Sequence, residues 1–233
     1  MDNASLSVHA SRLFVGPYDP ELRIRPSTVF ASALSVYGLP VRKSVAYDLL
    51  IRLDDVEAVR RVRVSASCSF TQLHLIIQAA YEWQNYHLYK FGFYQAGKSS
   101  YFDRPELELA PFAYDYEVDY KVEEIGTQRL SDYLPEWRCC EYEYDFGDGW
   151  THIVELAGII EDCDEELPKL LSASGVAPPE DAGGPGGFED FLAIMQDAEH
   201  SRHEEMLRWA RAQGWKPLDY ERVERRVRYA LWW

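Results

Sequence analysis

The chain has 233 residues, a mass of 27.0 kDa and a formal net charge of −15, with 47% hydrophobic and 14% aromatic residues. A chain of this length and composition can bury one substantial core, so we expect a globular protein. It contains no apolar run of about 18 residues, and its start lacks the basic and apolar regions of a secretory leader, so we expect a soluble protein that is not exported. The cysteine spacing fits neither a disulfide framework nor a CxxC site, so the predicted location is cytoplasmic.

The negative charge is concentrated in the middle of the chain. Residues 101–190 carry 24 acidic and only 5 basic side chains. Such a field repels nucleic acid and attracts cations or basic protein surfaces. We therefore expect a protein partner with a basic surface rather than nucleic acid as a direct ligand, although solubility alone would also account for the charge.

The first half of the chain predicts an irregular extension over residues 1–40, followed by a domain over residues 41–233. Alternating β-branched residues predict an antiparallel strand pair over 44–66, with a turn at Asp54 and Asp55. The next segment predicts a helix over 69–82, because Ser69 and Gln72 fit a capping box and apolar residues recur at helical spacing.

The second half predicts further strands, a long acidic loop and a helical tail. The segments are a strand over 86–94, a candidate strand over 113–124, a short helix over 128–134, a hairpin over 138–160, a mobile loop over 161–187, and three short helices from about residue 188 to 231. The predicted fold class is α+β: one domain with a mainly antiparallel twisted sheet, the capped helix packed on it, and a C-terminal helical segment.

The segment YEYDFGDGWTH, residues 142–152, is the strongest hairpin signal. Asp148-Gly149 fits a two-residue type I′ turn, and this register would place Asp145 opposite His152. The pair would either fix the register, act as general base and orienter, or supply two ligands of a metal site, with His74 or His87 as a third. The residues alone do not choose between these interpretations.

Two other charged or glycine-rich segments invite functional interpretations. Residues 183–187, GGPGG, lack the Lys-Ser/Thr of a P-loop, and the helix that follows offers only backbone amides to an anion. The arginines of the last predicted helix alternate with glutamates, as on a solvated helix face. These arginines are Arg222, Arg225, Arg226 and Arg228.

Three segments together resemble one known family. LHLIIQAAYEWQNYHLYKF, YEYDFGDGWTHIVEL and PPEDAGGPGGFEDFL are similar in order and spacing to the signatures of the Ri-plasmid open-reading-frame-three-like family, whose members are also described as TnpR-like passengers of insertion elements. The resemblance implies a single α+β domain associated with plasmids and transposons, without an established reaction. It also implies a set of polar and glycine motif residues: His74, Gln78, Trp83, His87, Asp145, Gly147, Asp148, Trp150, His152, Glu180, Asp181, Gly183 and Gly184.

Three functions are compatible with these features, in descending order. The first is a non-enzymatic accessory protein of mobile elements that binds a basic protein partner through its acidic, aromatic surface, in the extreme as a nucleic-acid mimic. The second is a metal-dependent hydrolase or nuclease with Asp145 and His152 as catalytic residues and Asp145, Asp148, His152 and His87 as ligands. The third is a nucleic-acid accessory factor in transposition. No cofactor is expected, apart from a divalent metal under the second hypothesis.

Overall fold

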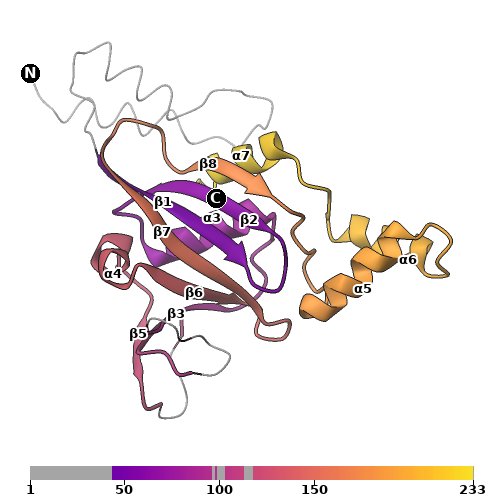
Figure 1. The fold of residues 1–233 in the computed structure, drawn as a ribbon, viewed down its shortest axis with the longest axis horizontal. Coiled ribbons are helices and arrows are strands. Elements are labelled where there is room, and N and C mark those ends of the chain that lie inside the picture. The colour runs from indigo at the N-terminus through magenta and orange to yellow at the C-terminus, as the bar shows by residue number, and fades with distance from the viewer. Residues whose placement is uncertain (1–43, 96–97, 99–102, 113–117, 233) are drawn as a thin grey trace, which may run out of the picture. The chain divides into compact units, whose positions relative to one another are not determined.

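The computed structural model describes residues 44–95, 98, 103–112 and 118–232. These residues form one eight-stranded sheet in the order β5-β4-β3-β6-β7-β1-β2-β8 (Figure 1). The strands are β1 (Ser44–Leu53), β2 (Val59–Ser65), β3 (Tyr89–Phe93), β4 (Leu107–Ala110), β5 (Lys121–Glu124), β6 (Cys139–Tyr144), β7 (Trp150–Cys163) and β8 (Lys169–Ser174). The helices are α3 (Phe70–Tyr81), α4 (Leu130–Trp137), α5 (Gly184–Gln196), α6 (His203–Ala212) and α7 (Tyr220–Arg228).

Neighbouring strands are antiparallel except for β4 and β5, which pair in parallel. The α+β fold class predicted from the sequence is therefore confirmed. The β1–β2 pair also forms as predicted, with Asp55 at the turn in the left-handed region, at φ 58°. The predicted extension over residues 1–40 lies outside the described residues, as do residues 113–117 of the candidate strand.

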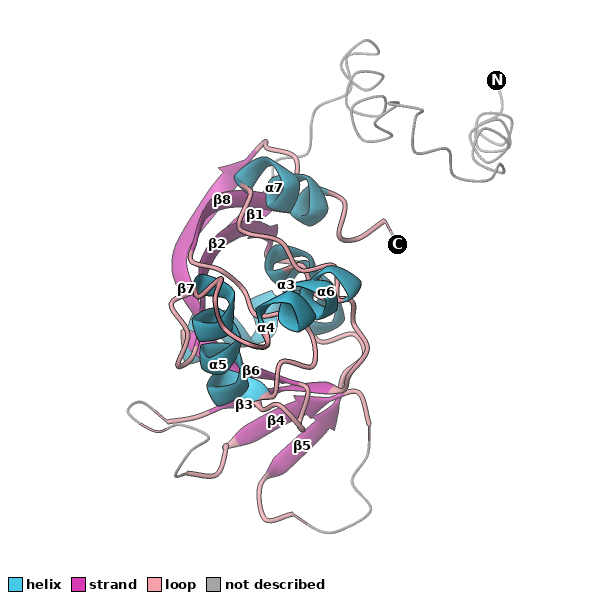
Figure 2. Cartoon of the chain, turned by 90° about the vertical axis from the view of Figure 1, so that its right-hand side faces the viewer, coloured by secondary structure: helices cyan, strands magenta, loops and turns pink. Residues whose placement is uncertain are grey.

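Helix α3 packs on one face of the sheet and begins at the predicted capping box. The Ser69 side chain accepts the amide of Gln72, and the Gln72 side chain accepts the amide of Ser69. The apolar stripe of the helix is fully buried, and the Phe70 ring makes an edge contact with Phe91 at 5.1 Å between centroids. Figure 2 shows α3 and α7 on the same side of the curved sheet.

The acidic segment 161–187, predicted as a mobile loop, contains the end of β7, all of β8 and the start of α5, so the prediction of a loop is wrong. Strand β7 continues to Cys163, and β8 pairs with β2 from Val59↔Ser174 to Arg63↔Lys169. The α7 side chain Tyr220 then donates to the backbone carbonyl of β8 at Leu170. Pairing and helix docking, which are tertiary contacts, thus override a polar composition that by itself suggests a loop.

The three predicted C-terminal helices are present, and the last one anchors the end of α3. Arg222 donates to both carboxylate oxygens of Glu82, at 2.6 and 2.9 Å, and Arg226 donates to the backbone carbonyl of Trp83. Arg228 pairs with Glu224 within α7. Arg222 is therefore engaged inside the protein, whereas Arg225 and Arg226 are exposed, as predicted for a solvated helix face. Among the described residues, no helix combines the length and apolarity that crossing a membrane requires.

Candidate functional site

The β6–β7 hairpin carries the site, and its loop is longer than predicted. The ladder pairs Tyr144 with Trp150 and Tyr142 with His152, so the loop comprises residues 145–149. Asp145 adopts φ 56°, and its side-chain oxygen accepts the amide of Gly147 at 3.1 Å. This side-chain turn replaces the two-residue Asp-Gly turn. The predicted cross-strand pair of Asp145 and His152 is therefore wrong.

His152 lies in the core rather than beside Asp145. Its side chain is fully buried, with the rings of Tyr81 and Trp83 packed edge-on at 4.6 and 5.2 Å. Neither ring nitrogen has a hydrogen-bond partner of normal geometry within the described part of the chain. Burial lowers the pKa of His152 to about 3, and nearby backbone groups oppose this decrease only in part. A neutral, enclosed imidazole of this kind has no access to a surface substrate.

His87, rather than His152, is the histidine that lies beside Asp145. Its Nε2 atom lies 3.5 Å from Asp145 Oδ2, 3.6 Å from Glu180 Oε2 and 3.1 Å from Asp181 Oδ1. This nitrogen is shielded from solvent and is not aligned for a hydrogen bond with any described residue. We call His87, Asp145, Glu180 and Asp181 the His87 site. It brings together three carboxylates around one imidazole nitrogen.

Tyr144 joins the segments that build the His87 site. Its hydroxyl accepts the backbone amides of Tyr86 and His87, at 2.9 and 3.3 Å, and donates to the carboxylate of Glu180 at 3.1 Å. Glu180 also accepts the backbone amide of Gln84 at 2.6 Å. Burial raises the pKa of Glu180, although these donors and His87 counteract the effect. Tyr144 was absent from the predicted site residues, and only its position before Asp145 hinted at its role.

His74 and Gln78 form a buried layer behind the site. The His74 ring donates to or accepts from the Tyr142 hydroxyl and the Asn85 side chain, each at 2.7 Å, and Gln78 donates to the same hydroxyl. Gln78 also accepts the backbone amide of Asn85, which adopts φ 61°. Burial lowers the pKa of His74 to about 4. These two residues, predicted as binding residues, fix the turn that leads from α3 to His87.

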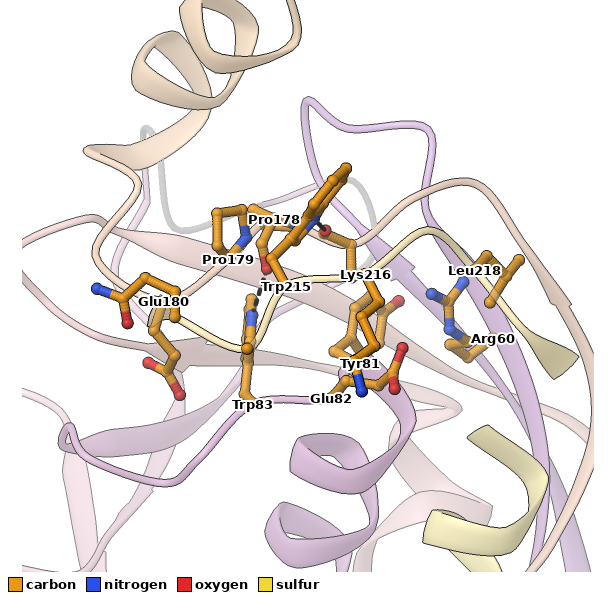
Figure 3. Close-up of a pocket in the computed structure, with 13 residues that line it drawn as sticks. Arg60, Tyr81, Glu82, Trp83, Pro178, Pro179, Glu180, Trp215, Lys216 and Leu218 are labelled. Atoms are coloured by element: carbon orange, nitrogen blue, oxygen red, sulfur yellow. Dashed lines mark hydrogen bonds between the residues drawn. The ribbon is translucent and has the colours of Figure 1, made fainter. Parts of the chain in front are cut away.

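Trp83 supports the segment that carries Glu180, and Trp150 lies beside Trp83. The Trp83 indole donates to the backbone carbonyl of Pro178 at 2.8 Å, as Figure 3 shows. Trp83 stacks on Tyr144 with 5.0 Å between centroids and lies 6.1 Å from Trp150. A cavity lined by Trp83, Pro178 and Pro179 has a volume of about 20 Å³. This volume suffices for a water molecule but not for a substrate.

Asp148 and the two glycines close the loop onto the same segment. Asp148 accepts the backbone amide of Gly183 at 3.0 Å, so its carboxylate is used for docking rather than placed among the cluster's ligand atoms. Gly184 adopts φ 71°, and a Cβ there would lie 2.6 Å from the carbonyl oxygen of Asp148. Only glycine permits this approach of the two backbones.

Besides Asp148, Gly183 and Gly184, which dock the loop, the predicted site residues fall into two groups. His87, Asp145, Glu180 and Asp181 converge, whereas His74, Gln78, Trp83, Trp150 and His152 lie behind them in the core. Asp181 also borders a second cavity of about 250 Å³ between α5 and α6. Its lining residues include Phe191, Arg202, Met206 and Trp209.

Comparisons with known proteins place the whole site within one family. The family described as plasmid pRiA4b ORF-3-like protein matches residues 45–226. The uncharacterized protein y4hQ of Sinorhizobium fredii is 35% identical over 170 residues, which cover 69% of this chain and 78% of the relative. The crystal structure of MM3350 from Methanosarcina mazei Go1, a protein of unknown function, superposes with a TM-score of 0.63 at 28% identity, covering 77% of this chain and 98% of that one. The chain belongs to the plasmid pRiA4b ORF-3-like protein family.

Proposed function

We propose that the protein binds a divalent metal at the His87 site and acts as a metal-dependent hydrolase. One observation carries the proposal: the ligand atoms of His87, Asp145 and Asp181 all lie within 4.8 Å of one another. Imidazole nitrogen and carboxylate oxygen are the ligands that zinc, manganese and ferrous iron accept in proteins. Of the four metal ligands predicted from the sequence, His87 and Asp145 remain in the proposed ligand set. Asp181 replaces Asp148 and His152.

The electrostatics of the site favour a cation. Two carboxylates about 4 Å apart repel each other by roughly 4 kcal/mol at the effective dielectric constant of a protein surface. The His87 site holds three carboxylates within 3.6 Å of one nitrogen. A protonated His87 would supply a single positive charge, whereas a divalent ion supplies two and uses the neutral imidazole as a ligand.

The arrangement also supports hydrolysis. Three protein ligands leave coordination positions for water, and a bound divalent ion makes that water more acidic. Glu180 is buried beside His87, and burial raises its pKa, so its carboxylate has increased affinity for a proton from such a water. Within this proposal, His87, Asp145 and Asp181 hold the ion and Glu180 accepts the proton.

The metal content of protein purified without chelator tests the first half of the proposal. We expect about one equivalent of a transition metal in the parent protein, and its loss in His87→Ala and in Asp181→Asn. Asp190→Asn is the matched control, because Asp190 is an exposed aspartate on α5 outside the cluster. Folded protein that binds no more zinc or manganese than its Asp181→Asn variant would refute the metal site.

Hydrolysis is then measured on the metal-loaded protein. Phosphodiester, ester and peptide substrates are offered in parallel, with Glu180→Gln as the variant that retains the cluster's shape. We expect turnover of one substrate class that is lost in Glu180→Gln while metal binding persists. Metal binding without any turnover would reduce the function to cation binding.

Binding of a basic protein partner is the second candidate function. It is favoured by the acidic surplus of residues 101–190 and by the exposed apolar side chains around the His87 site. The third hypothesis, a nucleic-acid accessory factor, is less favoured, because three of the four arginines that supported it, Arg222, Arg226 and Arg228, are engaged with Glu82, Trp83 and Glu224.

A further inference from the structure

Three large apolar side chains are exposed directly around the His87 site. Tyr86 is 65% exposed, Leu88 56% and Phe146 42%. Their backbone segments lie close together, because the Asp145 amide donates to the Leu88 carbonyl at 3.0 Å and the Tyr86 amide donates to the Tyr144 hydroxyl. We call Tyr86, Leu88 and Phe146 the apolar rim. Each of its members is adjacent in sequence to His87 or Asp145.

Folding alone does not explain the exposure of the rim. Tyr89 is buried in the sheet immediately after Leu88 and stacks on the His74 ring at 3.6 Å. Burying apolar surface stabilises a protein by roughly 25 cal/mol per Å², and the exposed rim side chains forgo this stabilisation. Apolar side chains gathered beside a polar site commonly mark an interaction surface.

The charges near the rim specify what it would bind. The Lys90 ammonium group already lies over the Phe146 ring, 5.6 Å from its centre, and pairs with Glu108 and Glu143. The ring of Phe146 thus already makes a cation–π contact with a lysine of the protein itself, which is the kind of contact that a basic partner would extend. Asp181 is the most exposed carboxylate of the His87 site, with 53% of its side chain accessible. Aromatic faces beside a solvent-accessible carboxylate suit guanidinium and ammonium groups with long aliphatic stems.

We propose that the apolar rim and Asp181 dock an arginine- and lysine-rich polypeptide segment across the His87 site. The aliphatic stems and guanidinium planes of the segment pack on the rim, and its charges face Asp181. If the segment is the substrate, this proposal names the substrate class of the proposed hydrolase, and in that respect it rests on the proposed function. The docking itself requires no metal. The acidic surplus of residues 101–190 disfavours nucleic acid at the same surface.

Fluorescence anisotropy of a labelled peptide of alternating arginine and leucine tests the docking. The comparison peptide carries glutamate in place of arginine, and both are measured with chelator present. We expect binding of the arginine peptide only, weakened by salt. The double variant Tyr86→Ser, Phe146→Ser should bind at least about tenfold more weakly. Ile159→Ser is the matched control, since Ile159 is an exposed apolar residue on β7 outside the rim, and it should bind like the parent.

Leu88→Ser provides a second rim variant in case the double variant unfolds, and it should also weaken binding severalfold. Equal affinity of the rim variants and Ile159→Ser, or equal affinity of the two peptides, would overturn the proposal. Preferred binding of a single-stranded DNA of the same length would overturn it as well. A dimer of the parent protein in sedimentation that dissociates in the rim variants would also overturn the proposal, because a second copy of the chain would then cover the rim.

Metal content measured on the same samples separates this proposal from the proposed function. Rim variants should lose the peptide and keep the metal. Parent protein that binds the arginine peptide but no metal would refute the metal centre and leave the docking surface intact.

Discussion

The hydroxyl of Tyr144 donates to the carboxylate of Glu180 at 3.1 Å, and this contact ties the β6–β7 hairpin to the segment that follows β8. The same hydroxyl accepts the amides of Tyr86 and His87. One side chain therefore sets the relative positions of the three segments that form the His87 site.

Replacing Tyr144 by phenylalanine should loosen that junction without creating a cavity. We expect the free energy of unfolding to fall by about 1–3 kcal/mol, because buried partners are left unsatisfied. In the proposed metal site, the affinity should fall by about tenfold or more, as is typical when a group orienting a ligand is lost. Urea denaturation and zinc titration measure the two effects. Tyr220→Phe, which removes one hydroxyl bond to Leu170, should leave the metal affinity unchanged.

Glycine 184 should tolerate no side chain. Gly184→Ala would place a Cβ 2.6 Å from the Asp148 carbonyl oxygen at φ 71°, so we expect a loss of about 1–3 kcal/mol in unfolding free energy. Gly186→Ala, in the same helix and with nothing within 4 Å of its Cβ, should instead be neutral or stabilise by up to about 1 kcal/mol. Thermal unfolding of the two variants checks the contrast, and similar destabilisation by both would contradict it.

His152 should make the protein sensitive to mild acid. Burial lowers its pKa to about 3, whereas an unfolded chain has a histidine pKa of about 6.5. Between these values the unfolded state binds a proton that the folded state does not, so stability falls as the pH decreases through this window. The slope approaches roughly 1.4 kcal/mol per pH unit for this group, and above pH 7 the contribution vanishes.

The variant His152→Leu isolates this contribution from that of the acidic residues. Its unfolding free energy should decline less steeply than that of the parent between pH 6 and about pH 4, when both are measured by denaturant titration. Parallel pH profiles would show that His152 finds a compensating partner in the folded state. His74, whose pKa burial lowers to about 4, should cause a similar but smaller dependence.

The ion pair between Arg222 and Glu82 should contribute to stability more than an ordinary surface pair. Its geometry is bidentate, and both side chains are about one-fifth exposed. A double-mutant cycle with Arg222→Ala and Glu82→Ala should give a coupling energy of about 1 kcal/mol. The i,i+3 pair of Arg202 and Glu205, which is largely exposed, should give a value near zero.

Most of the fold could be predicted from local signals in the sequence. The capping box at Ser69 and the alternation around Val62 and Val64 are encoded within a few residues, and both elements formed as predicted. Strand β8 was missed, because its residues form a strand only once β2 is beside them. Acidic composition alone was a poor guide for that segment.

The members of the site were predictable, but their grouping was not. The sequence indicates His87, Asp145 and Asp181 as candidates, but the Asp-Gly turn that it predicts pairs Asp145 with His152. The side chain of Asp145 instead bonds to the amide of Gly147, which lengthens the loop and changes the register. The choice between the two-residue Asp-Gly turn and the longer loop depends on the relative stability of their hydrogen bonds, which residue types alone do not reveal.

The His87 site draws its members from positions 87, 145, 180 and 181, which are far apart along the chain. During synthesis, a chain that ends before residue 180 can already contain β1 to β8, but it lacks two of the three carboxylates. The repulsion among the carboxylates arises only when the final segment docks beside the hairpin. A ligand with positive charge would therefore act late, and would favour the fully closed molecule over any truncated or partly opened form.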